Sequence, residues 1–335
     1  MAARAAFVFL IATTLASCGG DLPGVVSGSG SAPAISPDSS AEDGEDIALP
    51  EDEQLFQQGL AAFNEAEGAA DAGSTAEAGE KFATAQVSFD RLWSDYPSSG
   101  RHDNAGYLRG RCRYELGDYA GAIATLLEMR AAHPDSVFLN DAAYYTGQAR
   151  FQLGQYQEAI ADFEDSITAG PGSVYADNAA YYVGRSYYEA GELANARASL
   201  AGFETAYPQS VYLDNARYYL GRSNFDAGLY ADALGPFERV LLTAGSIYED
   251  DARFYHGRSF FHLGDYGAAI ADFENLLTAF PLSQYADNAL LFEIRSFIAQ
   301  SNCADAGTAL ARMTAAYPAS TLITRAQADF SAGCA

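Results

Sequence analysis

The chain has 335 residues, of which 49% are apolar, so it can build a packed core and is not disordered over its whole length. Its 44 acidic residues outnumber the 19 basic ones, which gives a formal charge of -25. A surface this negative repels phosphate backbones and anionic lipid headgroups, so nucleic acid is not expected as a partner. Most of the charge is expected to form a solvated acidic surface.

Residues 1–17 are predicted to be a lipoprotein signal peptide. Arg4 precedes an apolar run of about 11 residues, which is too short to span a bilayer. The segment Leu15-Ala16-Ser17-Cys18 resembles the lipobox of bacterial lipoproteins. This resemblance implies cleavage before Cys18, a lipid on its sulfur, and sorting to the outer membrane because Gly19 follows. The alternative is ordinary signal cleavage with an incidental cysteine.

Residues 18–50 are predicted to be the lipidated cysteine and a disordered tether. Gly, Ser, Pro and acidic residues dominate this stretch, and nothing in it could nucleate a core. A coil of this length has an end-to-end distance of roughly 30 Å, which would hold a folded body clear of a membrane.

Residues 51–335 contain a repeat of 37 residues, with one step of 36. A serine, a glycine, an alanine, a bulky apolar residue and a proline recur in this order, except that Ile294 replaces the glycine once and Gly245 replaces the proline once; the serines are Ser99, Ser136, Ser173, Ser210, Ser246, Ser283 and Ser320. Each unit is predicted to be two helices: the serine caps the first, a further glycine such as Gly191 ends it, and the proline stops the second. Copies must stack, because a single helical hairpin cannot bury its apolar face.

The pattern resembles the tetratricopeptide repeat over about residues 55–334. The residues that carry the resemblance are a small residue in the first helix, then an alanine, an aromatic residue and a terminal proline, as in Gly147, Ala159, Phe163 and Pro171. The resemblance implies an all-α fold, a tetratricopeptide-type α-solenoid in which antiparallel helix pairs form a right-handed superhelix. The stretched period is similar to that of the outer-membrane barrel-assembly lipoprotein and of the Tol–Pal coordinator.

The array is expected to hold about seven hairpins and a closing helix over about residues 321–331. The first repeat is irregular, and residues 64–80 are predicted to be a long loop within it. Such an array needs a terminal helix with a polar outer side to remain soluble.

No catalytic chemistry is expected. The four histidines are scattered, the glycines recur once per repeat and form no phosphate loop, and no metal site or cofactor is predicted. Residues present in every copy serve structure or binding, so the protein is not expected to be an enzyme. Cys112 stands where other copies have alanine or serine, which indicates a small buried residue.

Cys303 and Cys334 are predicted to form a disulfide. Cys303 begins a second helix and Cys334 ends the closing helix, so they should lie on the same edge of adjacent layers. Export to an oxidising compartment would permit the bond. The alternative is two free thiols.

A polar and aromatic set also recurs in the first helices, at spacing i, i+3, i+7, which puts its members on one face. The sets are Asn178, Tyr181, Arg185; Asn215, Tyr218, Arg222; and Asp251, Phe254, Arg258. In tetratricopeptide arrays this face lines the concave groove, so by resemblance it is expected to bind an extended partner segment, acidic or C-terminal. The alternative is that the arginines only neutralise first-turn acids of adjacent repeats, such as Asp177 and Asp214.

The sequence therefore favours a periplasm-facing lipoprotein that binds other proteins as a scaffold or adaptor, in outer-membrane assembly or envelope maintenance. Its expected contact with a membrane is the lipid on Cys18. One alternative is a structural spacer with no ligand. Another is a ligand-capturing or enzymatic protein on a repeat scaffold, which would need a second domain.

Overall fold

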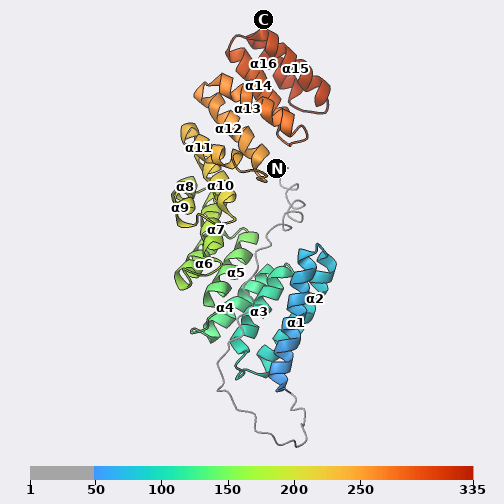
Figure 1. Ribbon diagram of the computed structural model, residues 1–335, viewed down its shortest axis with the longest axis vertical. Helices are drawn as coiled ribbons and strands as arrows, with labels where there is room; N and C mark the ends of the chain where they lie inside the picture. Colours follow the sequence, from blue (N-terminus) through green and yellow to red (C-terminus); the bar gives the residue numbers. More distant parts are fainter. Residues whose placement is uncertain (1–48, 335) are drawn as a thin grey trace, which may run out of the picture. The chain divides into compact units, whose positions relative to one another are not determined.

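Residues 49–334 of the chain are described by a computed structural model, and they form helices without any strand (Figure 1). The predictions for the signal peptide, Cys18 and most of the tether lie outside the described residues. The helices are α1 (Glu51–Asp71), α2 (Thr75–Asp95), α3 (His102–Glu115), α4 (Tyr119–Ala132), α5 (Leu139–Gln152), α6 (Tyr156–Ala169), α7 (Ala176–Glu189), α8 (Leu193–Ala201), α9 (Phe203–Ala206), α10 (Leu213–Asp226), α11 (Tyr230–Leu241), α12 (Glu249–Leu263), α13 (Tyr266–Ala279), α14 (Ala286–Ala299), α15 (Cys303–Ala316) and α16 (Ile323–Gly333).

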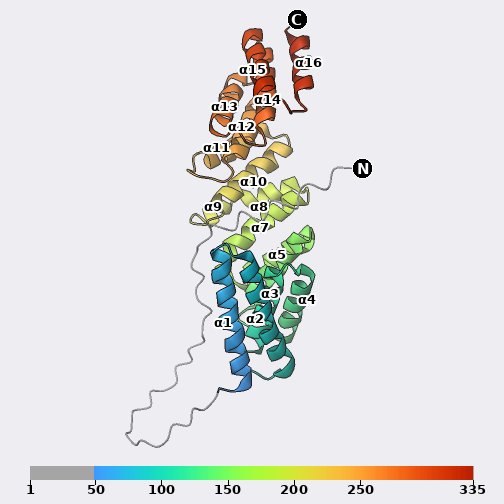
Figure 2. The ribbon, with the colours of Figure 1, turned by 90° about the vertical axis from the view of Figure 1, so that its right-hand side faces the viewer.

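The prediction of an all-α fold built from helix pairs is confirmed for this part of the chain. The described residues form two compact units, which divide between Ala149 and Arg150. Within the second unit the pairs follow one another in chain order and end at α16 (Figures 1 and 2). Among the described residues no helix has both the length and the apolar character needed to cross a membrane.

In the first unit, the predicted long loop over residues 64–80 is wrong. Helix α1 continues to Asp71 and α2 begins at Thr75, so a three-residue turn joins them, and Gly73 takes a φ of +78° there. The alanines and glutamates of this stretch favour helix, and the longer helices bury more apolar surface. Phe63 and Phe82 meet edge to face with ring centroids 5.4 Å apart.

The recurring glycines allow the two helices of a pair to cross closely. A Cβ built on Gly184 would lie 2.4 Å from Leu200 Cδ2, and one on Gly221 would lie 2.6 Å from Phe237 Cε1. Leu200 and Phe237 are the bulky apolar residues of the repeat, and each is at most 3% exposed. Any larger residue at the glycine would therefore push the pair apart.

The recurring serine is not the helix N-cap that the sequence pattern suggested. Ser173 lies three residues before α7, whose N-cap is Tyr175. Its Oγ instead accepts a hydrogen bond from the Tyr175 backbone N–H at 3.0 Å. In the last repeats the same hydroxyl also donates to an aspartate of the preceding repeat, at 2.7 Å both from Ser283 to Asp250 and from Ser320 to Asp287. The serine therefore shapes a turn and joins two repeats.

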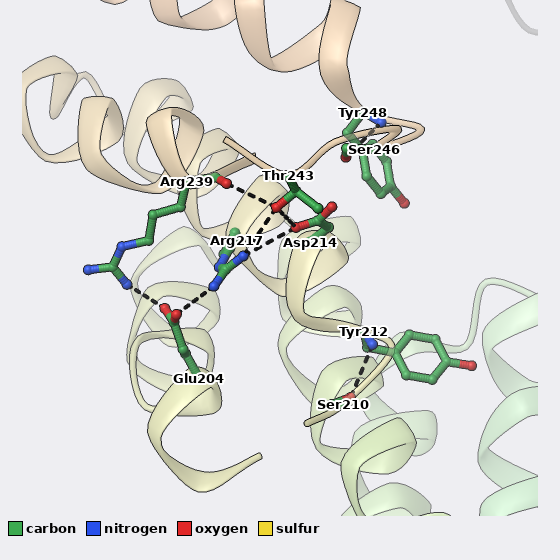
Figure 3. A network of polar contacts seen from close by, with 9 residues as sticks. All are labelled: Glu204, Ser210, Tyr212, Asp214, Arg217, Arg239, Thr243, Ser246 and Tyr248. Atoms are coloured by element: carbon green, nitrogen blue, oxygen red, sulfur yellow. Dashed lines mark hydrogen bonds and ion pairs between the residues drawn. The ribbon is translucent and has the colours of Figure 1, made fainter. Parts of the chain in front are cut away.

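The single step of 36 residues falls between Ser210 and Ser246, where the joint is rebuilt (Figure 3). Here Thr243 Oγ1 donates to Asp214 Oδ1 at 2.8 Å and takes the place of the serine. Arg217 bridges Asp214 and Glu204, at 3.3 and 2.5 Å, and Arg239 also pairs with Glu204. This network ties α9, α10 and α11 together despite the shortened loop.

Candidate functional site: the arginine ladder of the second unit

The predicted groove residues lie on consecutive first helices of the second unit. Asn178, Tyr181 and Arg185 lie on α7, and the corresponding sets lie on α10 and α12. Helix α10 contacts both α7 and α12, so the sets form a continuous row. Arg295 holds the corresponding position on α14, which contacts α12. We call Arg185, Arg222, Arg258 and Arg295 the arginine ladder.

The aromatic members of the sets are buried, so they are not part of a surface that a ligand can contact. Tyr181, Tyr218 and Phe254 are 1%, 5% and 3% exposed. Each stacks nearly parallel on the tyrosine that opens the next repeat, and the pairs are Tyr181–Tyr212, Tyr218–Tyr248 and Phe254–Tyr285, with centroids 5.0, 4.4 and 4.6 Å apart. They hold adjacent repeats together, because stacked rings remove large apolar areas from water.

The Asn and Asp members also bond between repeats. Asn215 Nδ2 donates to the Tyr248 hydroxyl at 3.1 Å. Asp251 accepts from the Tyr218 hydroxyl at 3.2 Å and from the Tyr285 hydroxyl at 2.5 Å. Burial raises the pKa of Asp251, although these two hydroxyls favour its ionised form. These side chains therefore have a packing role that the sequence did not reveal.

Each ladder arginine of α7, α10 and α12 lies between aromatic rings of the repeats before and after it. The guanidinium carbon of Arg185 is 4.9 Å from the Phe151 ring centroid and 5.2 Å from that of Tyr219. Arg222 lies 5.7 Å from Tyr188 and 4.0 Å from Tyr255. Such cation–π contacts stabilise by about 0.5–2 kcal/mol each, so the ladder contributes to the packing of the repeats.

Arg258 is held in the same way, with Phe225 and Phe292 at 4.7 and 5.0 Å. Its Nε is buried and has no hydrogen-bond acceptor. Burial lowers the pKa of Arg258.

Three of the four ladder arginines have a carboxylate partner. Arg185 pairs with Glu189 at 3.7 Å, and Arg222 pairs with Asp226 at 3.3 Å. Arg295 pairs at 2.7 Å with Asp329, which the closing helix α16 supplies. Glu189 and Asp226 lie one turn further along the same helix, whereas Asp329 lies on a different helix from Arg295.

The alternative that the arginines neutralise Asp177 and Asp214 is therefore wrong in its detail. Asp214 binds Arg217 and Thr243 instead. Asp177 accepts the backbone N–H of Asn178 at 2.9 Å. The broader idea behind that alternative, that the row is architecture, agrees with the ring stacking and the ion pairs.

A disulfide joins Cys303, at the start of α15, to Cys334, the C-cap of α16, with the Cα atoms 5.5 Å apart. Together with the ion pair between Arg295 and Asp329, it fixes the closing helix to α14 and α15. Cys112 in the first unit is a free, fully buried thiol, and burial raises its pKa to about 12. Its chemistry is that of a small core residue.

Sequence reasoning missed the tyrosines that receive the stacked rings and the residues one turn after each arginine. A signal was present for both. The tyrosines recur two residues after the serine, at Tyr175, Tyr212, Tyr248 and Tyr285, and the residues four after each arginine are Glu189, Asp226, His262 and Ala299. In the described part of the chain, no group of three or more His, Cys, Asp or Glu residues could hold a metal ion.

Comparison with known protein families finds two family models that match the sequence of this chain. The family model of YfiO, an outer membrane lipoprotein, matches residues 139–300, and a tetratricopeptide repeat model matches residues 104–136. No curated protein matches the chain in sequence. The chain therefore resembles the YfiO family over nearly half of its length.

Solved structures of tetratricopeptide proteins are similar in fold. The C-terminal part of a repeat protein from Cytophaga hutchinsonii is 17% identical, with 81% of this chain and 98% of that chain covered and a TM-score of 0.62. A tetratricopeptide repeat protein from Parabacteroides merdae is 14% identical, with 82% and 99% covered and a TM-score of 0.48. The likeness to the Cytophaga hutchinsonii structure, together with the match to the tetratricopeptide repeat model, shows that the solenoid is of the tetratricopeptide type.

Proposed function

We propose that this chain, a tetratricopeptide array that resembles the outer membrane lipoprotein family YfiO, is a lipid-anchored envelope protein that binds other proteins as a scaffold or adaptor. The lipobox-like segment that ends at Cys18 supports the anchor. The family resemblance supports the outer membrane, with the array facing the periplasm, and a role in outer-membrane assembly or envelope maintenance.

The observation that carries the proposal is the arginine ladder. Aromatic rings hold its guanidinium groups in fixed positions, yet the side chains of Arg185 and Arg222 remain 27% and 19% exposed. A rigid row of cations on an otherwise acidic protein can attract an acidic segment and loses little entropy on binding it. Partners are therefore proteins or extended peptide segments, and no enzymatic step is proposed.

A second surface supports protein binding. After three consecutive recurring serines the next residue is an exposed aliphatic side chain, with Val174, Val211 and Ile247 55%, 72% and 65% exposed. Exposed apolar side chains that recur in register mark a contact surface.

One observation favours the spacer alternative. Because the ladder packs one repeat against the next, its recurrence has a structural explanation that needs no ligand. The two functions predict different results when a partner is sought.

The anchor is tested first. Replacing Cys18 with alanine should release the chain into a soluble fraction while its helicity stays the same. A variant that still pellets with membranes stripped of other proteins would contradict the lipid anchor.

Partner binding is tested by site-specific photo-crosslinking in intact cells. A crosslinker at exposed Ala190 or Ala227, at the ends of α7 and α10, should yield defined protein adducts. The same crosslinker at exposed Glu238 or Glu274, on the second helices α11 and α13, is the matched control. Equal yields at all four positions, or none, would favour the spacer.

A further inference from the structure

Among the described residues, Arg258 is the one arginine of the ladder that has no carboxylate partner. In the described residues, no carboxylate oxygen lies within ion-pair distance of its guanidinium, whereas Arg185, Arg222 and Arg295 each have one. Arg258 is only partly buried, and α12 presents it on the same face as its counterparts.

The missing acid has a simple sequence cause. The position four residues after the arginine is Glu189 on α7 and Asp226 on α10, but on α12 it is His262. A histidine carries no negative charge at any pH, so it cannot replace the carboxylate. His262 instead stacks on Tyr230, with ring centroids 4.3 Å apart, and it remains exposed.

The neighbouring acid is already engaged. Asp226 pairs with Arg222 at 3.3 Å and accepts a hydrogen bond from the Tyr188 hydroxyl at 2.8 Å. It therefore cannot turn to Arg258 without breaking both contacts. Arg258 therefore has no ion pair of its own among the described residues, and Asp226 attracts it only from beyond ion-pair distance.

The rings around Arg258 prepare it for an anion. Phe225 and Phe292 flank the guanidinium, and Phe254 and Tyr255 lie 5.4 and 5.7 Å from it. Rings on several sides fix the guanidinium and reduce the water around it, which strengthens a charge-assisted hydrogen bond with a carboxylate.

We propose that Arg258 is a binding site for a carboxylate of a partner protein. The other three arginines of the ladder each pair with a carboxylate. This carboxylate can come from a different helix, because Asp329 of α16 lies 2.7 Å from Arg295. This proposal rests on the proposed scaffold function and names one contact through which a partner protein would bind. The carboxylate can belong to an acidic side chain or to a chain terminus.

Three short peptides test the site and distinguish the two sources. One contains a glutamate and ends in an amide, the second has glutamine in its place and ends in an amide, and the third has glutamine and a free C-terminus. The readout is the NMR signal of the Arg258 Nε–H group, assigned by its loss in Arg258→Lys. We expect the Nε–H signal to shift with the first or the third peptide, and not with the second. A shift of equal size with the neutral peptide overturns the proposal.

A matched pair of variants tests whether the absence of a carboxylate at position 262 makes Arg258 available to a partner. His262→Glu restores the pattern of α7 and α10, so its own carboxylate should occupy Arg258 and weaken peptide binding about tenfold or more. His262→Gln adds no charge and should bind as the native chain does. Both changes remove the same ring contact with Tyr230 at an exposed position, so the two variants differ only in the carboxylate that His262→Glu adds. Equal affinities of the two variants overturn the proposal.

The converse variant is Glu189→His, which removes the acid from Arg185 on α7. It should create a second carboxylate-responsive arginine, seen as a new shift of the Arg185 Nε–H signal. No new shift would mean that the missing acid is not what makes Arg258 a binding site.

Failure of this inference can be told apart from failure of the scaffold function. Partner adducts that survive unchanged in His262→Glu would leave the scaffold function standing and overturn the role of Arg258. Carboxylate binding at Arg258 without any adduct at Ala190 or Ala227 would support the site and contradict the scaffold.

Discussion

The hydroxyl of Ser283 donates a hydrogen bond to Asp250, 33 residues earlier in the chain, at 2.7 Å. The same oxygen accepts the backbone N–H of Tyr285 at 3.2 Å, and the Tyr285 ring stacks on Phe254. One short polar side chain thus shapes the turn before α14 and links it to α12. This explains why a serine recurs at the joints between repeats.

Replacing Ser283 with alanine should lower the free energy of unfolding by about 1–2 kcal/mol, because Asp250 loses a charge-assisted donor and the turn loses its acceptor. Chemical denaturation followed by circular dichroism measures the loss. Gln284→Ala, at the exposed next position, is the control and should change the stability by less than about 0.5 kcal/mol. A loss no larger than that of the control would show that the bond does not stabilise the joint.

Replacing Arg222 with methionine should cost about 2 kcal/mol or more, because it removes the contact with Tyr255 at 4.0 Å, the ion pair with Asp226 and a bond to the Tyr218 hydroxyl. Arg239→Met is the matched control, since Arg239 is 61% exposed and pairs with Glu204 at the surface. Similar melting temperatures for the two variants would contradict a structural ladder. For the same reason, removing Arg185, Arg222 and Arg258 together cannot separate binding from folding.

The disulfide between Cys303 and Cys334 closes a loop with a sequence separation of 31, and chain entropy alone should make it stabilise α16 by roughly 3–4 kcal/mol. Cys303→Ser should therefore speed amide hydrogen exchange over residues 323–333. Cys112→Ser, which places in α3 the residue found at the corresponding sites of other repeats, should leave exchange in α16 unchanged. Thiol counting gives a direct check: more than one free thiol in a mature chain lipidated on Cys18 would rule out the disulfide.

Glu293→Gln should change the pH dependence of stability. Glu293 on α14 is 2% exposed, and burial raises its pKa to about 7. The charge of Arg312, at 3.8 Å, opposes this rise, and the negative charge of Glu274 adds to it. A carboxyl whose folded-state pKa lies above its unfolded value of 4.5 stabilises the fold below pH 4.5 and loses that contribution as the pH rises to about 7.

The glutamine variant should therefore match the native chain near pH 4 and exceed its stability by on the order of 2 kcal/mol near pH 8. Thermal melts across this range measure the difference. Glu238→Gln, at an exposed position on α11, should show no such crossover. If the difference in stability between the native chain and the Glu293→Gln variant is the same at both pH values, the raised pKa of Glu293 is contradicted.

Much of the fold could be predicted because the 37-residue recurrence is strong. The glycine, alanine and bulky residue of each copy act within one hairpin, so their spacing along the chain already states which atoms meet, as Gly221 and Phe237 do. The extra residues of the first repeat were misread as a loop, because no second copy showed that α1 and α2 could simply be longer.

The candidate site could be located from the sequence, but its role could not. The sequence placed Tyr181, Tyr218 and Phe254 on one helical face, and only the tertiary structure showed that the next repeat covers that part of the face. The contacts of Arg185 and Arg222 likewise involve rings from the repeats before and after them. Local patterns determine which side chains recur, whereas contacts between residues 30 or more positions apart decide what surrounds them, as when Phe292 lies against Arg258 and Asp329 pairs with Arg295.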